Sequence, residues 1–519
     1  MQVTHERLAA TLAVLWPEIR LPASLDLDAT QTLTLSRDSR ALATNTGPAV
    51  FIAVPGVQVD GRRFIDQALE GGAVLVLAEA GAAFEERHAA QERVLSLPGL
   101  SHALGELGRL LFDVPENLEL IGVTGTNGKS SVTHYIAALS ERLGCPAGVI
   151  GTLGWGRAGQ LIDSGQTTPG PLELQAALGS MAGDGVKRVA AEVSSHALEQ
   201  ERLLGCRVTA AVFTNLSRDH LDYHASMAAY AAAKARLFKR RELRLAVVNA
   251  DDSLTRLMLA GLPQGVRVLA CGEQEATTFR VLDWHPHASG QRVLIATPDG
   301  ERALEMALMG RFNLDNVLLA MAVLYGLGED LDGLCEAACE LLPVPGRMQT
   351  VSRHGMPTVV VDYAHTPDAL SNALSALRAH LPGDGHDDTH AEVSDSAKLW
   401  CVFGCGGDRD SGKRPLMAEA VQPLADRVVI TDDNPRGENP ATIREQILRG
   451  LSPADRERAW CIDGRGNAID RTIKEAGNND VILIAGKGHE NYQEIQGQRT
   501  PFSDQEWAEA ALAKRGVPT

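Results

Sequence analysis

Apolar residues fall into short runs that alternate with amphipathic stretches along the chain. The first twenty residues, MQVTHERLAATLAVLWPEIR, predict an amphipathic helix. Apolar runs at 49–56 and 73–80 predict two strands, and DGRRFIDQALEGG between them predicts a helix. This pattern indicates a small α/β domain over residues 1–113. The segment 112–120, FDVPENLEL, carries Pro and Asn and is typical of a linker.

The region 114–343 repeats an apolar strand, a loop and a helix. Strands are predicted at 120–123, 186–193, 208–216 and 243–249. Strands that alternate with helices indicate a parallel sheet whose two faces are covered. Near 291–309 the pattern changes to that of a hairpin, QRVLIATPDGERALEMAL, and the following NLDNVLLAMAVLYGLG predicts a buried helix.

A second alternating series follows the boundary segment LLPVPGRMQTV. Its strands are predicted in TVVVDYAH, KLWCVFGCGG, DRVVITDD and DVILIAGKG, and each ends in a cluster of Gly, Asp or His. Open α/β sheets bind ligands beyond the C-terminal ends of their strands, so chemistry is expected at these clusters. The predicted fold class is α/β with three domains: 1–113, a central P-loop-type, mostly parallel sheet domain (114–343), and a C-terminal Rossmann-like α/β domain (344–519).

One polar stretch interrupts the C-terminal series, PGDGHDDTHAEVSDSA at 382–397. Its closely spaced His and Asp residues suggest a metal site. Nothing around them indicates a rigid set of ligands, so we expect a solvated surface loop.

Composition excludes several classes of function. The chain has 519 residues, with 49 Lys and Arg against 66 Asp and Glu, and a formal net charge of −17. Such an acidic chain without a basic tract is a poor candidate for sequence-independent binding of nucleic acid. No apolar stretch is long enough to span a membrane, and the N-terminus lacks the basic start of a signal peptide. The eight cysteines form no CxxC pair, so we expect reduced thiols and a cytoplasmic location. We also expect a monomer.

The strongest single motif is IGVTGTNGKSSV, residues 121–132, in which an apolar strand runs into a glycine-rich loop and a helix. Glycines let backbone N–H groups turn toward phosphate oxygens, and the helix N-terminus adds partial positive charge. Lys129 supplies a charge for the terminal phosphates, and the Ser130 hydroxyl can bind Mg²⁺. The spacing is shorter than in a Walker motif, but strand, loop and helix together predict ATP binding. The residues concerned are Gly125, Thr126, Asn127, Gly128, Lys129, Ser130 and Ser131.

Acidic and imidazole side chains follow two other strands of the predicted central sheet. Glu192 ends the strand VKRVAAEV, and Asp219, His220, Asp222 and His224 follow the next strand. Mg²⁺ prefers oxygen ligands, so these strand ends are candidates for its site. Glu192 alone could equally cap a helix, and His220 alone could be a hydrogen-bonded core histidine. Lys234, in HASMAAYAAAKARLF, would by itself be a solvated helical lysine.

The motifs taken in order resemble the Mur ligase family, and within it the MurE type. They are GTNGKSS, EVSSH, TNLSRDHLDYH, GRFNLDN, PGRMQ, DYAHTPDAL, GCGGDRDSGKRP and DDNPR. The resemblance implies an ATP-dependent amide-forming ligase of peptidoglycan precursor synthesis. It would add meso-diaminopimelate to the D-glutamate of UDP-N-acetylmuramoyl-L-alanyl-D-glutamate through an acyl phosphate, with Mg²⁺ as cofactor.

The resemblance also implies roles for individual residues. Asn313, Asn316, Arg347, Asp362 and His365 would join the loop residues in binding ATP. Ser130, Glu192, His220 and a carbamylated Lys234 would bind Mg²⁺, and Lys129, Lys234, His220 and Glu192 would be catalytic. The UDP-muramoyl-dipeptide would be bound by Ser39, Val57, Gln58, Val59, Thr167, Thr168, Ser194, Gln200 and Arg202. The incoming amino acid would be bound by Arg409, Asp433, Asn434, Pro435, Arg436, Gly486 and Glu490.

Three alternatives remain open at this point. A lysine-adding ligase of the same type would bind a side chain without a second carboxylate, whereas the Arg436 of DNPR offers a fork suited to one. A folylpolyglutamate-type ligase shares the nucleotide loop and the lysine but lacks the N-terminal UDP-binding domain and DNPR. A nucleotide-dependent switch would not require the basic residues at the C-terminal strand ends.

Overall fold

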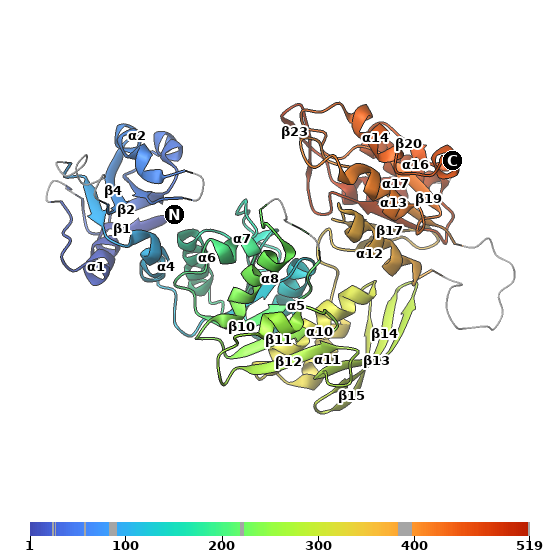
Figure 1. The fold of residues 1–519 in the computed structure, drawn as a ribbon, viewed down its shortest axis with the longest axis horizontal. Helices are drawn as coiled ribbons and strands as arrows, with labels where there is room; N and C mark the ends of the chain where they lie inside the picture. The colour runs from blue at the N-terminus through green and yellow to red at the C-terminus, as the bar shows by residue number, and fades with distance from the viewer. Residues whose placement is uncertain are drawn as a thin grey trace. The chain divides into compact units, whose positions relative to one another are not determined.

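The computed structural model describes residues 1–22, 25, 27–56, 59–81, 91–217, 219, 223–381 and 397–516. The chain divides into two compact units, Met1–Leu269 and Ala270–Thr519. Helices and strands alternate in both units (Figure 1). The polar insertion lies outside the described residues except for Ala397. Among the residues that are described, no helix is both long enough and apolar enough to cross a lipid bilayer.

The first unit begins with a five-stranded sheet of order β1-β2-β3-β4-β5, in which only the β1–β2 pair is antiparallel. Its strands are β1 (Gln2–Thr4), β2 (Thr32–Ser36), β3 (Ala49–Ala53), β4 (Ala73–Glu79) and β5 (Val94–Leu97). Its helices are α1 (His5–Leu15), α2 (Ile65–Glu70) and α4 (Leu100–Leu111), with 3₁₀ turns η1 (Ser39–Thr44) and η2 (Gly61–Phe64).

Alternation along β3 explains how this sheet is covered on both faces. Val50 and Ile52 pack in one core with residues of α1 and α4, whereas Phe51 and Ala53 pack in another with α2. The two predicted strands and both predicted helices are therefore confirmed, whereas β1, β2, β5 and α4 were not predicted from the sequence pattern.

A larger sheet follows, and six of its strands lie wholly in the first unit in the order β11-β10-β6-β9-β7-β8. They are β6 (Glu119–Thr124), β7 (Ala147–Gly151), β8 (Gly154–Gly156), β9 (Arg188–Glu192), β10 (Val208–Phe213) and β11 (Leu245–Asn249). The helices are α5 (Lys129–Arg142), α6 (Pro171–Gly183), α7 (Ser195–Glu199), α8 (Met227–Ala235), η3 (Arg236–Lys239) and α9 (Thr255–Leu259). Among these six strands, the described pairs are parallel except for β7–β8, which is antiparallel. Every residue of β7 and β9 is buried, as a two-sided parallel sheet requires.

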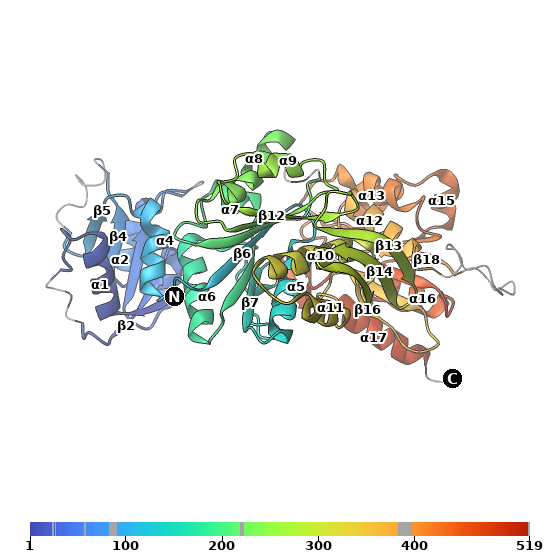
Figure 2. The ribbon, with the colours of Figure 1, turned by 90° about the horizontal axis from the view of Figure 1, so that it is seen from below.

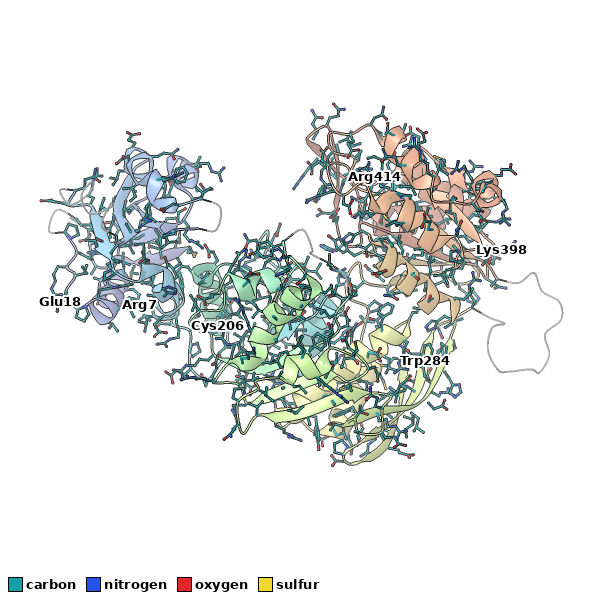
Figure 3. All side chains as sticks on the ribbon, in the orientation of Figure 1. Arg7, Glu18, Cys206, Trp284, Lys398 and Arg414 are labelled. Atoms are coloured by element: carbon teal, nitrogen blue, oxygen red, sulfur yellow. The ribbon has the colours of Figure 1, made fainter. Side chains whose placement is uncertain are left out.

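Strand β12 (Arg267–Gly272) contains the division between the units, and an antiparallel meander follows it in the second unit. The meander consists of β13 (Phe279–His287), β14 (Gly290–Thr297) and β15 (Gly300–Met306). Figure 2 shows β13 and β14 side by side. The helices α10 (Arg311–Gly326) and α11 (Leu331–Cys339) come next. The predicted hairpin and buried helix are confirmed, and β13 is an additional strand. Trp284, labelled in Figure 3, donates from Nε1 to Gln291 Oε1 at 2.7 Å across the β13–β14 pair.

The second unit ends with a six-stranded sheet of order β16-β17-β21-β18-β19-β20. The strands are β16 (Gln349–Val351), β17 (Thr358–Asp362), β18 (Leu399–Phe403), β19 (Arg427–Ile430), β20 (Trp460–Cys461) and β21 (Val481–Ala485). The helices are α12 (Pro367–Arg378), α13 (Lys413–Val421), α14 (Pro440–Leu448), α15 (Pro453–Arg458), α16 (Arg465–Glu475) and α17 (Asp504–Arg515). A small hairpin, β22 (Tyr492–Ile495) and β23 (Gln498–Pro501), lies beside Arg436, which bridges to Ile495.

The strand order determines where this sheet can bind a ligand. Residues of β17, β18, β19 and β21 alternate between a core with α12, α13 and α14 and a core with α16 and α17. Because these four strands are parallel, their C-terminal ends share one edge. The last strand of this sheet along the chain, β21, lies between β17 and β18, so segments far apart in sequence meet at that edge.

Candidate active site

The nucleotide loop connects β6 to α5 and depends on two glycines in the left-handed region. Gly125 has φ +152° and Gly128 has φ +83°. A Cβ atom on Gly125 would lie 1.8 Å from Thr214 Oγ1. A side chain therefore cannot replace the hydrogen at Gly125 without moving the end of β10. The predicted strand, loop and helix are confirmed in this segment.

The segment after β10 holds the loop in place through hydrogen bonds. The Thr126 N–H donates to Asn215 O at 2.8 Å, and the Asn127 N–H donates to Asn215 Oδ1 at 3.0 Å. The hydroxyl of Thr214 donates to Asn127 O at 2.6 Å. These hydrogen bonds hold the loop backbone in place, and α5 begins directly at Lys129.

Two lysines share the carbonyl of Gly125. Lys129 Nζ donates to Gly125 O at 3.0 Å and to Thr126 O at 2.8 Å. Lys234 Nζ donates to Gly125 O at 2.7 Å and lies 4.5 Å from the centre of the Tyr230 ring. The second lysine is only 1% exposed, so it is not the solvated lysine that its helix alone suggested. Burial, together with the charge of Lys129, lowers the pKa of Lys234 well below its usual value.

Glu192 ends β9 beside the start of the nucleotide loop, since it pairs in register with Val123. Its Oε1 accepts from the Thr152 N–H at 2.9 Å and its Oε2 accepts from the Thr152 hydroxyl at 3.2 Å. A Cβ atom on Gly151 would lie 2.2 Å from Glu192 Oε1. A glycine at 151 therefore leaves the room that the buried carboxylate occupies.

Part of the predicted metal cluster cannot be placed. His220 and Asp222 lie outside the described residues, and His224 is buried with Nε2 2.9 Å from Ser195 Oγ. Among the described residues, no three His, Cys, Asp or Glu side chains are grouped as a metal site. Carboxylate and hydroxyl oxygens nevertheless suit Mg²⁺, and Glu192 and Ser130 supply them at the ends of β9 and β6.

The predicted dipeptide-binding residues gather around Glu192. Thr167 Oγ1 lies 3.1 Å from Thr152 Oγ1, and the Thr168 hydroxyl donates to Glu192 O at 2.8 Å. Ser194 caps α7 by accepting from the Ala197 N–H. Arg202 donates from Nη1 to Thr168 O at 2.7 Å and from Nη2 to Gln200 Oε1 at 2.9 Å. The five predicted residues, Thr167, Thr168, Ser194, Gln200 and Arg202, therefore form one connected network.

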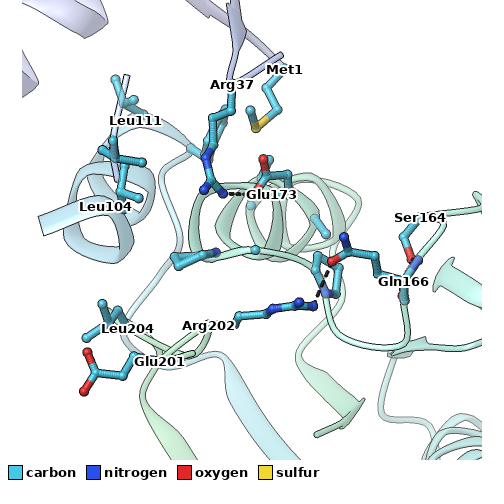
Figure 4. Close-up of a pocket in the computed structure, with 18 of the residues that line it drawn as sticks. Met1, Arg37, Leu104, Leu111, Ser164, Gln166, Glu173, Glu201, Arg202 and Leu204 are labelled. Carbon is cyan, nitrogen blue, oxygen red and sulfur yellow. Dashed lines mark hydrogen bonds and ion pairs between the residues drawn. The ribbon is translucent and has the colours of Figure 1, made fainter. Parts of the chain in front are cut away.

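A pocket of about 1020 Å³ in the first unit adjoins this network (Figure 4). It is lined by Gln200 and Arg202 on one side and by Arg37 on another. Arg37 Nη1 lies 3.6 Å from Glu173 Oε2, and Arg202 Nη1 donates to Gln166 Oε1 at 2.8 Å, as the dashed lines show. Two arginines lining one pocket can attract an anionic ligand. Burial lowers the pKa of Arg202.

The predicted uridine-binding residues are only partly described. Ser39 begins η1, is buried, and donates from its hydroxyl to Gln67 Oε1 at 3.1 Å. Val59 is 52% exposed. Val57 and Gln58 lie outside the described residues.

In the second unit, the residues predicted to bind nucleotide occupy three segments. Asn313 and Asn316 are buried on α10, and Asn313 Nδ2 donates to Met309 O at 2.8 Å. Asp362 ends β17 and accepts from the Met348 and Ala364 N–H groups at 2.7 and 2.8 Å.

Beside Asp362, Arg347 places its guanidinium over the Tyr363 ring, 4.5 Å from the centroid. Burial raises the pKa of Asp362, although the charge of Arg347 opposes this shift. His365 donates from Nδ1 to Tyr363 O at 2.7 Å, so its Nε2 is the nitrogen left to accept. Burial lowers the pKa of His365.

The DNPR segment follows β19 and brings its polar side chains to one place. Asn434 accepts at Oδ1 from the Glu494 N–H at 2.9 Å and donates from Nδ2 to Glu490 Oε2 at 2.9 Å. Arg436, with φ +49°, donates from Nη1 to Gly407 O at 2.9 Å. Gly486 has φ +122°, and a Cβ atom there would lie 2.9 Å from Asp433 Oδ2.

The structure thus brings Asp433, Asn434, Gly486 and Glu490 together at the ends of β19 and β21. Pro435 follows Asn434 in the same loop, and its carbonyl accepts from the Glu438 N–H at 3.0 Å. Arg409 lies in the loop after β18 and is exposed.

Three buried cations near these residues were missed from the sequence. Lys487 is fully buried and contacts Asn434 and Glu490. Arg414 (Figure 3) donates to both oxygens of Glu438 and to Gly406 O; this pairing holds the pKa of Glu438 at about 2. Arg465 pairs with Asp504, both 0% exposed, and donates to Ala485 O at 2.9 Å. Their only sequence signal was position, since Lys487 and Arg414 lie in strand-end segments already singled out.

Comparison with known proteins covers nearly the whole chain. Three family profiles match: "Mur ligase family, catalytic domain" at 36–110, "Mur ligase middle domain" at 123–324 and "Mur ligase, glutamate ligase domain" at 346–488. The UDP-N-acetylmuramoyl-L-alanyl-D-glutamate--2,6-diaminopimelate ligase of Pseudomonas syringae pv. tomato is 46% identical, over 93% of this chain and 95% of its own. The enzyme of that name from Pseudomonas aeruginosa is 45% identical, over 93% and 96%.

A solved structure gives the same result in three dimensions. The structure of a UDP-N-acetylmuramoyl-L-alanyl-D-glutamate--2,6-diaminopimelate ligase aligns with a TM-score of 0.69 and 35% identity, and it covers 100% of both chains. The resemblance in the motifs, the α/β architecture with parallel-rich sheets and these matches agree. The chain belongs to the Mur ligase family.

Proposed function

We propose that the protein is an ATP-dependent amide-forming ligase that joins meso-diaminopimelate to the D-glutamate of UDP-N-acetylmuramoyl-L-alanyl-D-glutamate. The observation that carries the proposal is identity of 46% to a relative of that name over 93% of the chain. The product is a precursor of peptidoglycan. We place the reaction in the cytoplasm, since it consumes ATP and all eight cysteines are free.

The triphosphate of ATP would bind at the loop Gly125–Ser131. The left-handed glycines direct backbone N–H groups, and α5 directs its N-terminus, toward a bound anion. Lys129 would exchange its contacts with Gly125 O and Thr126 O for phosphate oxygens. In the second unit, Asn313, Asn316, Arg347, Asp362 and His365 would bind the rest of the nucleotide. Buried Arg347 Nε has no hydrogen-bond partner among the described residues, which supports an anionic or polar ligand for this side chain.

Mg²⁺ would be held by Ser130, Glu192, His220 and Lys234 in its carbamylated form. Bound there, it would neutralise charge on the phosphate oxygens and on the attacked phosphoryl group. Carbamylation needs a neutral amine, because the nitrogen lone pair forms the bond to CO₂ and one proton leaves. The lowered pKa of buried Lys234 supports that requirement.

The UDP-muramoyl-dipeptide would occupy the pocket that Arg37, Gln200 and Arg202 line. Its dipeptide end would reach Thr167, Thr168 and Ser194, which are hydrogen-bonded around Glu192. This arrangement would bring the glutamate carboxylate toward the metal-binding residues and the nucleotide loop of the same sheet. Ser39, Val57, Gln58 and Val59 would bind the uridine end.

The reaction would proceed by in-line transfer of the γ-phosphoryl group to the glutamate carboxylate, which gives an acyl phosphate and ADP. An amine of meso-diaminopimelate would then attack the acyl carbon, and the tetrahedral intermediate would collapse to the amide and inorganic phosphate. The amino acid would be bound by Arg409, the DNPR loop, Gly486 and Glu490. The arginine fork of Arg436 would accept the second carboxylate.

Two measurements test the proposal. Phosphate release should require UDP-muramoyl-dipeptide together with an amino acid, and in a panel of meso-diaminopimelate, L-lysine and ornithine only the first should support rapid turnover. Equal use of lysine would favour the lysine-adding alternative, and release without either cosubstrate would favour a nucleotide switch. ¹⁸O in the glutamate carboxylate should appear in the released phosphate, and its absence would exclude the acyl phosphate.

A further inference from the structure

Lys487 lies beneath the predicted amino-acid pocket and is fully buried. It follows Gly486 directly after β21, and its side chain has a relative exposure of 0%. Its Nζ donates to Asn434 Oδ1 at 3.1 Å and to Glu490 Oε2 at 3.2 Å, and it lies 3.8 Å from Asp433 Oδ1. One ammonium group therefore contacts three side chains that the sequence assigned to amino-acid binding.

These contacts fix the orientation of the Asn434 amide. Lys487 Nζ and the Glu494 N–H can only donate, so the atom that both contact is the amide oxygen. The Glu490 carboxylate can only accept from the amide nitrogen, at 2.9 Å. The oxygen of Asn434 is thus fully used, and the second N–H of its nitrogen remains to donate to a ligand carboxylate.

Carboxylates outnumber ammonium groups among the contacts of Lys487. Asp433 and Glu490 contribute two carboxylates, and Lys487 contributes one ammonium group within 4 Å of both. Arg465 also acts electrostatically on both carboxylates, but its hydrogen bonds go to Asp504. Glu490 contacts Asn434 and Lys487 through Oε2, so its Oε1 is the oxygen that can accept from a ligand ammonium group.

We propose that Lys487 is a positioning residue that orients Asn434 and Glu490. In this orientation Asn434 presents an amide donor and Glu490 presents a carboxylate. These two groups match the end of the amino-acid substrate that carries both a carboxylate and an ammonium group. This inference rests on the proposed function. Without Lys487, the amide loses one of its two fixed donors and Glu490 loses its buried counter-charge, so Glu490 turns toward water.

The test compares Lys487→Met and Lys487→Gln with the wild-type chain. Met removes the ammonium group at similar length, and Gln keeps a neutral hydrogen-bond donor. The KM for meso-diaminopimelate should rise roughly 10- to 100-fold in the Met variant and less in the Gln variant, because a hydrogen bond to a charged group has about that effect. The KM for ATP should stay within about 3-fold. The ratio of kcat/KM for meso-diaminopimelate to that for lysine should fall, since lysine carries an ammonium group there but no carboxylate.

Arg188→Met is the matched control. Arg188 is also a buried cation, 5% exposed at its side chain, but it begins β9 in the first unit and pairs with Glu119 at the start of β6. Its loss should lower the melting temperature without changing the KM for meso-diaminopimelate. Equal changes in the KM values for meso-diaminopimelate and ATP, no change in either, or unfolding of both Lys487 variants would each overturn the positioning role. A wild-type chain that does not use meso-diaminopimelate would instead overturn the proposed function.

Discussion

The nucleotide loop of the first unit and the predicted amino-acid pocket of the second both lie at the C-terminal ends of parallel strands, but different groups build them. The loop is made of backbone from one stretch of seven residues, Gly125–Ser131, held by hydrogen bonds from the segment after β10. The predicted pocket is made of side chains from the loops after β19 and β21, which contact one another and the backbone of the loop after β18.

This difference decides how each region tolerates change. Backbone N–H groups carry no net charge and need only the correct φ and ψ, so glycines suffice to build the loop. Buried side-chain charges must be paired, so each residue of the pocket depends on partners that lie far away in sequence. Variants in the loop should therefore abolish one step, whereas variants in the pocket should change which amino acid binds.

The largest effect is expected for Lys129→Ala. The variant removes the only side chain of the loop that carries a positive charge, and turnover should fall by about a thousandfold or more, because such a charge acts mainly on the transition state. The melting temperature should hardly change, since Lys129 donates to the carbonyls of Gly125 and Thr126 in its own loop. Phosphate release and circular dichroism measure the two quantities. A variant that retains turnover would show that backbone groups alone suffice.

Lys234→Ala should lower turnover by roughly 100-fold or more, because the carboxylate that carbamylation supplies would be lost with the side chain. Added formate or acetate should restore part of the activity by entering the space that Lys234 leaves. Glu192→Gln keeps the shape of the Glu192 side chain and serves as the control. It should also lose turnover, but formate and acetate should not restore it. If neither acid restores the turnover of Lys234→Ala while both variants stay folded, the proposal that Lys234 is carbamylated loses its support.

Arg436→Ala tests the other side of the comparison. The KM for meso-diaminopimelate should rise by about 10- to 100-fold, since a bidentate charged contact would be lost. The KM for ATP should be nearly unchanged. Arg409→Ala, at an exposed position, should have a smaller effect of the same kind. Equal changes in both KM values would remove Arg436 from the amino-acid pocket.

The sequence predicted the loop in full but the pocket only in part, and the comparison explains why. A strand, a glycine-rich turn and a helix are local patterns, and β6, Gly125, Gly128 and α5 lie where the pattern placed them. The ends of the four parallel strands in the second unit were also predicted from their apolar runs. The charge pairing behind the pocket was not, because Lys487 contacts Asn434 across 53 residues of sequence.

Short β-strands escaped the sequence for a similar reason. β1 and β8 have three residues each, too few for alternation to be distinguished from chance. Lys234 shows the same limit on a helix. Its alanine-rich surroundings fit a solvated lysine, yet the fold buries its side chain against Gly125, 109 residues away in sequence.

Dependence on distant partners extends beyond the pocket to His380, for which the smallest effect is expected. Its Nδ1 donates to His287 O at 2.8 Å, and its Nε2 accepts from the Gly310 N–H at 2.8 Å. Burial lowers the pKa of His380 below its usual 6.5. In the window below pH 6.5 the unfolded chain therefore binds more protons than the folded chain, and stability falls as the pH falls.

His380→Gln can keep both hydrogen bonds without titrating, so the loss of stability between pH 7 and pH 5.5 should shrink by about 1 kcal/mol or less. Buried His365, whose pKa is also lowered, contributes in the same direction and remains in the variant. Melting temperatures of the wild-type chain and the variant across this range measure the effect. A His380→Gln chain with the wild-type slope would show that the acid sensitivity of the second unit comes from other groups.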